Sequence, residues 1–242
     1  MPNSNIGGHY SQAFDEELQR AVDRLLEMAA LAQQQISDAM RAFTTADKEL
    51  AQKVKEGDRL VNNFEVDIDE QCLDILVRRQ PAASDLRLVI AVLKSIYDIE
   101  RIGDLAKRIA KIVIKETEGI RPEQARLDEL SAMSDKVQQM LLRTLTAFKT
   151  MDATLALEVL NEDKAIDEDY NRIINHSLGT MKDDGNQVMV SLQITQVARA
   201  LERVGDHSRN ICQHTIFLSK GRNVAHIKDE ELEQIVTQQR PD

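Results

Sequence analysis

Apolar side chains recur every three or four residues along almost the whole chain, which is the spacing of one face of an α-helix. Near the beginning the pattern runs through Leu18, Val22, Leu25, Leu26, Ala29 and Ala32. It predicts six long helices, approximately over residues 11–43, 47–79, 84–116, 123–150, 153–180 and 187–219. No segment shows the alternation of apolar and polar residues that is typical of a strand. We therefore expect an all-α protein.

The expected breaks between these helices carry residues that stop or start a helix. Residues 80–85, Gln-Pro-Ala-Ala-Ser-Asp, combine a proline stop with Ser84 as a helix N-cap and Asp85 in the next first turn. Residues 118–122 contain a glycine and a proline and form the best candidate for a linker, and residues 183–186 are typical of a tight turn.

These breaks divide the chain into two bundles. Helices of about 30 residues are about 45 Å long, and short loops force neighbouring helices to pack antiparallel. With a linker near residues 119–122, the helices form two tandem three-helix bundles. We predict a first bundle over residues 1–118, a second over 119–220, and a C-terminal extension over 221–242 that carries a short appended helix.

An internal repeat supports this division. The motif Glu-Arg-Ile-Gly-Asp at residues 100–104 recurs as Glu-Arg-Val-Gly-Asp at residues 202–206, which is 102 residues later. Upstream, residues 58–62 align with residues 163–167 at an offset of 105. Each half therefore places the same short elements on the second and third helices of its bundle.

Charge and composition narrow the class of function. The 242 residues include 41 acidic and 31 basic side chains, for a formal net charge of −10. Aromatic residues make up 3% and there is no tryptophan. A binder of the phosphate backbone needs a basic field, and single-stranded nucleic acid needs aromatic stacking platforms. Nucleic acid is therefore not an expected partner.

The expected location is the cytosol. No window approaches the roughly 18 apolar residues of a membrane span, and the first residues lack the basic and apolar stretches of a signal peptide. Cys72 and Cys212 lie far apart without metal-type spacing, so we expect two small buried side chains in a reducing compartment.

Candidate chemistry lies in acidic pairs spaced four residues apart on the helices, which places both side chains on one helical face. Three pairs are fully acidic: Glu100 and Asp104, Glu202 and Asp206, and Asp163 and Asp167. The fourth, Asp58 and Asn62 in the first half, has an amide in place of the second acid. Like charges at this spacing oppose helix formation, and each Glu-Arg-aliphatic-Gly-Asp motif also holds a glycine, which costs a helix about 1 kcal/mol relative to alanine.

Two interpretations of these acids remain open. In one, they form solvated faces neutralised by nearby basic residues, and the glycines only let two helices approach closely. In the other, facing pairs on antiparallel helices form carboxylate patches suited to hard cations or iron, and the glycines leave room for the ion. The repeat then predicts two sites, of which the first is weaker or differently built because of Asn62.

Catalysis has little support in the sequence, so we expect a protein that is not an enzyme. The alternative is a metal-dependent helical carboxylate enzyme, but that class needs Glu-x-x-His pairs, and none of the five histidines follows a glutamate at that spacing. We expect His207 at the surface or in a cap, and His176 and His214 in structural roles. There is no phosphate-binding loop, nucleophile elbow or cysteine–histidine grouping.

At residues 79–87, Arg-Gln-Pro-Ala-Ala-Ser-Asp-Leu-Arg, and at the two repeated motifs, the sequence resembles the PhoU family of accessory regulators of bacterial phosphate-specific transport. The resemblance covers roughly residues 10–225. It implies two three-helix bundles with outward-facing metal-cluster sites, holding divalent or trivalent ions such as iron, zinc, manganese or magnesium. The implied ligands are Asp58, Glu100, Asp104, Asp163, Asp167, Glu202 and Asp206, with Asn62 where the family motif has an acid.

The resemblance also implies a function. Members of the family repress the phosphate-starvation (Pho) regulon when phosphate is plentiful. They link the ATPase subunit of the phosphate ABC transporter to the phosphate sensor histidine kinase and catalyse no reaction. On this basis we expect a cytoplasmic homodimer that reaches the inner membrane only through these partners.

Overall fold

The computed structural model describes residues 12–116, 121–225, 227 and 229–237. Within these ranges the regular structure is entirely helical. The helices are α1 (Gln12–Thr45), α2 (Lys48–Arg79), α3 (Ala83–Lys115), α4 (Gln124–Thr150), α5 (Ala153–Asp183), the 3₁₀ turn η1 (Gly185–Gln187), α6 (Val188–Lys220) and α7 (Asp229–Thr237). The six predicted long helices are confirmed to within three residues at each end.

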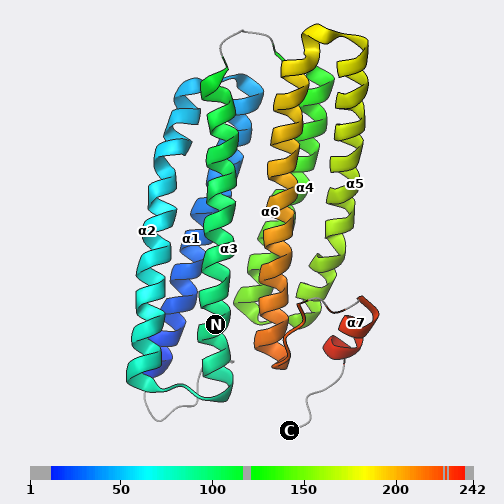
Figure 1. Ribbon diagram of the computed structural model, residues 1–242. Helices are drawn as coiled ribbons and strands as arrows, with labels where there is room; N and C mark the ends of the chain where they lie inside the picture. Colours follow the sequence, from blue (N-terminus) through cyan, green and yellow to red (C-terminus); the bar gives the residue numbers. More distant parts are fainter. Residues whose placement is uncertain (1–11, 117–120, 226, 228, 238–242) are drawn as a thin grey trace.

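The long helices form two bundles that lie side by side (Figure 1). Helices α1, α2 and α3 pack on one another, as do α4, α5 and α6. The bundles meet mainly where α3 contacts α6, with a smaller contact between α1 and α4. The appended helix α7 packs against α5 and α6. The predicted domain boundary between residues 118 and 119 lies outside the described residues.

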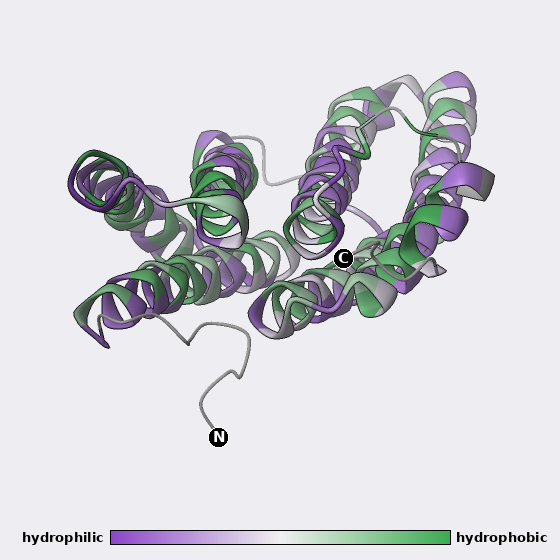
Figure 2. Cartoon of the chain, turned by 90° about the horizontal axis from the view of Figure 1, so that it is seen from below, coloured by the Kyte–Doolittle hydropathy of each residue, from purple (hydrophilic) through white to green (hydrophobic). Residues whose placement is uncertain are grey.

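The apolar stripes turn towards the interior of each bundle, as the end-on view of Figure 2 shows. Leu25 on α1, Ile99 on α3 and Leu130 on α4 have no exposed surface. Both cysteines are buried and free, as expected, and burial raises the pKa of each thiol to about 12. Among the described helices, none is long and apolar enough to cross a membrane.

The loop between the first and second helices has the same structure in both bundles, at positions 105 residues apart. Ala46 and Met151 adopt left-handed backbone conformations, with φ of 53° and 55°. The next residue caps the following helix in both cases: Asp47 accepts a hydrogen bond from the Leu50 amide, and Asp152 accepts from the amides of Thr154 and Leu155. The repeat therefore extends to the turn that fixes the direction of α2 and α5.

The expected serine cap at the start of α3 is wrong. The helix begins at Ala83, and its N-cap residue is Ala82, which makes no side-chain capping bond. Because the helix starts one residue before Ser84, the serine hydroxyl lies inside the first turn, where it contacts the Asp85 carboxylate at 3.5 Å.

The helical glycines of the two repeated motifs lie where the third helix of each bundle meets the second. A Cβ atom on Gly103 would lie 3.2 Å from Val61 Cγ1, and one on Gly205 would lie 3.2 Å from Asp163 Oδ1 and 3.3 Å from Ile166 Cδ1. Side chains of α2 and α5 therefore occupy the space beside both glycines. This favours close helix approach over the interpretation in which the glycines leave room for an ion.

We predict opposite effects for two glycine substitutions. Gly179→Ala on α5, where nothing lies within 4 Å of the new Cβ, should raise the free energy of unfolding by about 0.5–1 kcal/mol through helix propensity. Gly103→Ala should instead lower it by about 1 kcal/mol, because Val61 is fully buried and β-branched and has little freedom to move. Urea denaturation followed by circular dichroism measures both, and an equal gain in the two variants would contradict the packing role.

Candidate functional site

The first acidic face lies on α2 and α3 and already contains a cation from the chain itself. Lys107 Nζ lies 2.6 Å from Asp58 Oδ2 and 3.5 Å from Asp104 Oδ1, so its ammonium bridges the two helices. Asp58 and Glu100 are largely buried, with 5% and 15% of their side chains exposed, whereas Asp104 is 38% exposed. The site is therefore a partly buried carboxylate group at the edge of the bundle.

The second acidic face, on α5 and α6, repeats this arrangement. Arg209, which follows Lys107 by the repeat offset of 102, places Nη1 3.3 Å from Oδ2 of buried Asp163. Glu202 has 12% of its side chain exposed, while Asp167 and Asp206 are exposed. Each half therefore pairs the buried aspartate of its second helix with a basic residue of its third helix.

The repeated glutamates share one electrostatic environment. Burial raises the pKa of Glu100, and the neighbouring Asp104 raises it further. Burial and the neighbouring Asp206 raise the pKa of Glu202 in the same way. Because each ionised glutamate is disfavoured by its surroundings, an added cation would stabilise it.

The donor atoms fit a hard cation in chemistry. Asp58 Oδ1, Asn62 Oδ1 and Glu202 Oε2 are buried oxygens without a hydrogen-bond partner among the described residues. Buried oxygens of this kind are costly unless something pairs with them, and carboxylate and amide oxygens are ligands of Mg²⁺ and Mn²⁺. Within the described part of the chain, however, no three acidic, histidine or cysteine side chains gather closely enough to hold a metal ion. The eight predicted ligands thus lie on two faces in repeated positions, and metal binding stays a prediction.

Glu65 belongs to the first acidic face, although the motif comparison does not select it. Burial raises its pKa, and both Asp69 and Asp104 act on it as neighbouring negative charges. Glu65 follows Asp58 by seven residues, or two helical turns, so the helical spacing alone would have found it. Its counterpart in the second half is Tyr170, so the two faces differ here as well as at Asn62.

A polar cluster between the bundles is the feature that sequence reasoning missed. Asp98 on α3 accepts hydrogen bonds from His207 Nδ1 at 2.8 Å, Asn210 Nδ2 at 2.9 Å and His214 Nε2 at 3.1 Å, all on α6. Burial alone would raise the pKa of Asp98, but these hydrogen bonds lower it to about 2. The expected surface or capping position of His207 is therefore wrong, because only the folded chain brings Asp98 within reach of it.

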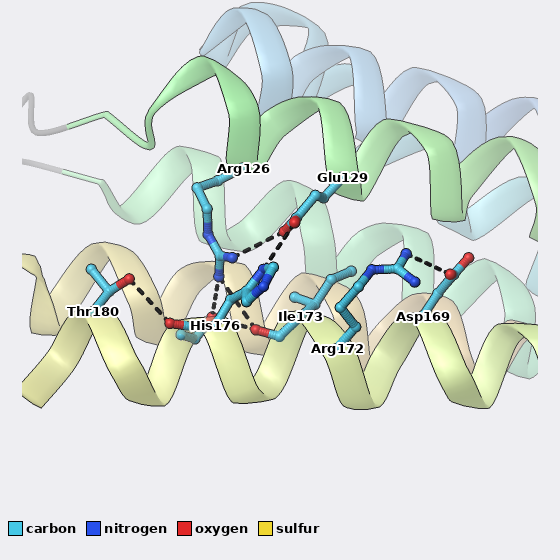
Figure 3. Close-up of polar contacts among 8 residues, drawn as sticks. Arg126, Glu129, Asp169, Arg172, Ile173, His176 and Thr180 are labelled. Carbon is cyan, nitrogen blue, oxygen red and sulfur yellow. Dashed lines mark hydrogen bonds and ion pairs between the residues drawn. The ribbon is translucent and has the colours of Figure 1, made fainter.

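His176 holds the structural role predicted for it, on the contact between α4 and α5 (Figure 3). Its Nδ1 lies 2.9 Å from Glu129 Oε1, while Arg126 Nη1 lies 2.9 Å from the other oxygen of the same carboxylate. Arg126 also donates to the Ser177 hydroxyl and to the Ile173 carbonyl oxygen. These bonds tie α4 to α5, and His214 has a comparable role between the bundles.

The fold and these faces define a class: an all-helical protein of two related three-helix bundles, with a repeated acidic face on each. A family model for the PhoU domain matches residues 25–113 and again residues 130–215, one match in each bundle. The chain belongs to the PhoU family.

Curated relatives and solved structures agree over most of the chain. It is 42% identical over 219 residues to the phosphate-specific transport system accessory protein PhoU homolog of Pseudomonas aeruginosa, covering 90% of each chain. It is 36% identical over 236 residues to the PhoU accessory protein of Escherichia coli, covering 98% of this chain and 97% of that one. The crystal structure of PhoU from P. aeruginosa matches with a TM-score of 0.82 at 41% identity, over 86% of this chain and all of that chain.

A second crystal structure, of the phosphate transport system regulatory protein PhoU from Streptococcus pneumoniae, matches with a TM-score of 0.80 at 31% identity. It covers 87% of this chain and 99% of that one. The predicted fold and the predicted family are confirmed. The family is one of accessory and regulatory proteins, so the prediction that the chain is not an enzyme is also confirmed.

The Asp98 cluster predicts a pH dependence of stability. A carboxyl whose pKa falls from 3.8 to about 2 on folding stabilises the fold above its unfolded pKa, and this contribution is lost as the pH falls through the folded value. The shift corresponds to about 2 kcal/mol. We therefore expect Asp98→Asn to lower the free energy of unfolding by about 2 kcal/mol at pH 7 and to converge with the unsubstituted chain near pH 2.

Denaturation curves between pH 7 and pH 2 test this expectation. Asp67→Asn is the control, because Asp67 pairs with Arg24 at the surface with 57% of its side chain exposed, and such pairs contribute about 0–1 kcal/mol. Parallel pH profiles for the Asp98 and Asp67 variants would show that the cluster does not act through the carboxylate.

Proposed function

We propose that this chain is an accessory protein of phosphate-specific transport that represses the phosphate-starvation response when phosphate is plentiful. The observation that supports it best is the similarity at 36–42% identity, over 90% or more of the chain, to proteins named as accessory to that system. In this proposal the chain links the ATPase subunit of the phosphate ABC transporter to the phosphate sensor histidine kinase. It acts at the cytoplasmic face of the inner membrane through these partners, as a homodimer.

The shape of the molecule suits an adaptor. Long antiparallel helices form stiff rods, and an adaptor needs a rigid surface that two partners contact in a fixed relation. On α2, Val66, Leu73 and Val77 share one side of the helix and are 50–76% exposed. An exposed apolar stripe of this kind is typical of a surface that meets another protein. The net charge of −10 favours partners with basic patches by electrostatic steering.

Metal ions at the two acidic faces are a further part of the proposal. Asp58, Asn62, Glu100 and Asp104 would contribute oxygens to the first, and Asp163, Asp167, Glu202 and Asp206 to the second. Burial, and after it the neighbouring aspartates, raise the pKa values of Glu100 and Glu202, and a bound cation would stabilise their ionised forms. It would also tie α2 to α3 and α5 to α6. The oxygen ligands favour magnesium, manganese or iron over zinc.

Capture from cells tests the adaptor. The tagged chain, recovered from cells grown in excess phosphate, should bring down the transporter ATPase subunit and the sensor kinase. Leu73→Ser with Val77→Ser should reduce this capture at least fivefold. Leu142→Ser with Leu178→Ser, which removes two comparably exposed apolar side chains from the second bundle, should leave it unchanged. Recovery of neither partner by the folded, unsubstituted chain would contradict the proposal.

Metal analysis tests the acidic faces separately. Glu202→Gln with Asp206→Asn should lower the affinity for Mn²⁺ at the second face at least tenfold and weaken repression, with helicity nearly unchanged. Asp23→Asn with Glu27→Gln removes the same charge from an exposed pair at the same spacing on α1, and should retain both. Equilibrium dialysis with elemental analysis gives the affinity and the number of ions. An unsubstituted chain without metal, or equal losses in the two variants, would contradict the metal sites while leaving the adaptor proposal to its own test.

A further inference from the structure

A basic groove lies on the seam between the two bundles, on α3 and α6. It has a volume of about 490 Å³. Its walls hold five arginine and lysine side chains and one carboxylate, that of Asp104. This local excess of positive charge contrasts with the net charge of −10 for the whole chain. The groove is therefore a site where anions are attracted to an otherwise acidic protein.

Within the described residues, the five basic side chains differ in whether hydrogen bonds or ion pairs hold them. Lys107 is held by Asp58, and Arg101 reaches Glu100 and Asp104 at 3.5 Å. By contrast, Arg108, Lys111 and Arg203 form no hydrogen bond or ion pair with any residue in the described ranges. All three are exposed. Like charges gathered in one groove repel one another, and an anion between them would remove that repulsion.

The internal repeat does not account for all of the positive charge in the groove. At the offset of 102, Arg101 corresponds to Arg203 and Lys107 to Arg209, so those positions are basic in both halves. Arg108 and Lys111, however, correspond to the neutral residues Asn210 and Gln213. Only one side of the seam therefore carries the two additional charges.

The groove side of the seam also lacks an equivalent of the Asp98 carboxylate. Asn210 donates to Asp98, whose own counterpart at the repeat offset is Ala200. The two sides of the seam thus differ in a coordinated way. On one side of the seam, Asp98 accepts hydrogen bonds from Asn210 and from two histidines of α6. On the other side, Ala200 stands at the position equivalent to Asp98, and the basic residue Arg108 stands at the position equivalent to Asn210. An anion from outside the chain would fill the role that Asp98 fills opposite.

We propose that this groove binds a small soluble anion that carries two or more phosphate groups. Guanidinium and ammonium groups are the side chains that bind phosphate oxygens most strongly, and arginine does so in a bidentate manner. The volume lies within the range of small-molecule sites and exceeds what one phosphate needs. The lining residues include no phenylalanine, tyrosine or tryptophan, and the one imidazole, that of His207, is held by Asp98, which favours the phosphate groups themselves as the recognised feature. The site is separate from the adaptor role and does not depend on it.

Titration calorimetry with pyrophosphate on the full chain, in metal-free buffer, tests the proposal. Arg108→Asn with Lys111→Gln copies the second repeat into the groove and should weaken pyrophosphate binding at least tenfold. Lys53→Gln with Lys55→Gln removes the same charge from exposed positions on α2 and should change the affinity less than twofold. Orthophosphate should bind at least tenfold more weakly than pyrophosphate, because it engages fewer of the basic groups.

Three results would overturn the proposal. They are the absence of pyrophosphate binding by the unsubstituted chain, an equal loss in the groove variant and the α2 control, and binding to phosphatidylglycerol vesicles without binding to pyrophosphate. The last result would show that the basic groups recognise a lipid surface instead of a soluble anion. Thermal unfolding of each variant verifies that it is folded, since both pairs lie at exposed positions whose substitution should leave the core intact.

Discussion

Helices α3 and α6 each pack against the two other helices of their own bundle and also against each other, so their surfaces must satisfy three neighbours at once. That constraint organises the rest of the molecule. Both repeated motifs lie on these two helices, and so do the Asp98 cluster and the basic groove. An amphipathic helix has one apolar stripe, which is too narrow to form all three contacts. The remaining surfaces of α3 and α6 therefore carry charged side chains, some of which are partly buried. The candidate chemistry of the protein lies in those faces.

The acidic faces show how the chain manages this charge without any added ion. Lys107 and Arg209 occupy equivalent positions in the repeat and pair with Asp58 and Asp163. A buried carboxylate needs such a partner, since an unpaired one would be strongly destabilising. Burial is the main reason why the pKa values of Glu100 and Glu202 rise, and the neighbouring Asp104 and Asp206 add to it. Burial raises the pKa of Asp163 as well, although Arg209 pairs with it. Lys107 and Arg209 already offset part of the negative charge, so a bound metal ion would compete with them for Asp58 and Asp163.

The seam between the bundles departs from the symmetry of the repeat in charge, although not in fold. Asp98 and its three donors fasten α3 to α6 on one side. On the other side, Ala200 replaces the aspartate, and Arg108, Lys111 and Arg203 form no hydrogen bond or ion pair within the described structure. Duplication explains why the two bundles share a shape and a turn geometry. It does not explain this difference, which arises where the two halves differ, at Asp98 against Ala200, Arg108 against Asn210 and Lys111 against Gln213, and which gives each side of the seam its own chemistry.

The sequence by itself determined the helices, their approximate ends and the repeat, because a period of 3.6 residues and the turn residues are local signals. It also determined that Glu100 shares a face with Asp104, since four residues make about one helical turn. Tertiary structure alone decided that Lys107 reaches Asp58, that Gly103 meets Val61, and that His207 binds Asp98 across 109 residues of sequence. Such contacts depend on the rotation of each helix about its axis and on the pairing of the bundles. Those quantities are set by the packing of many side chains together, and no local spacing reports them.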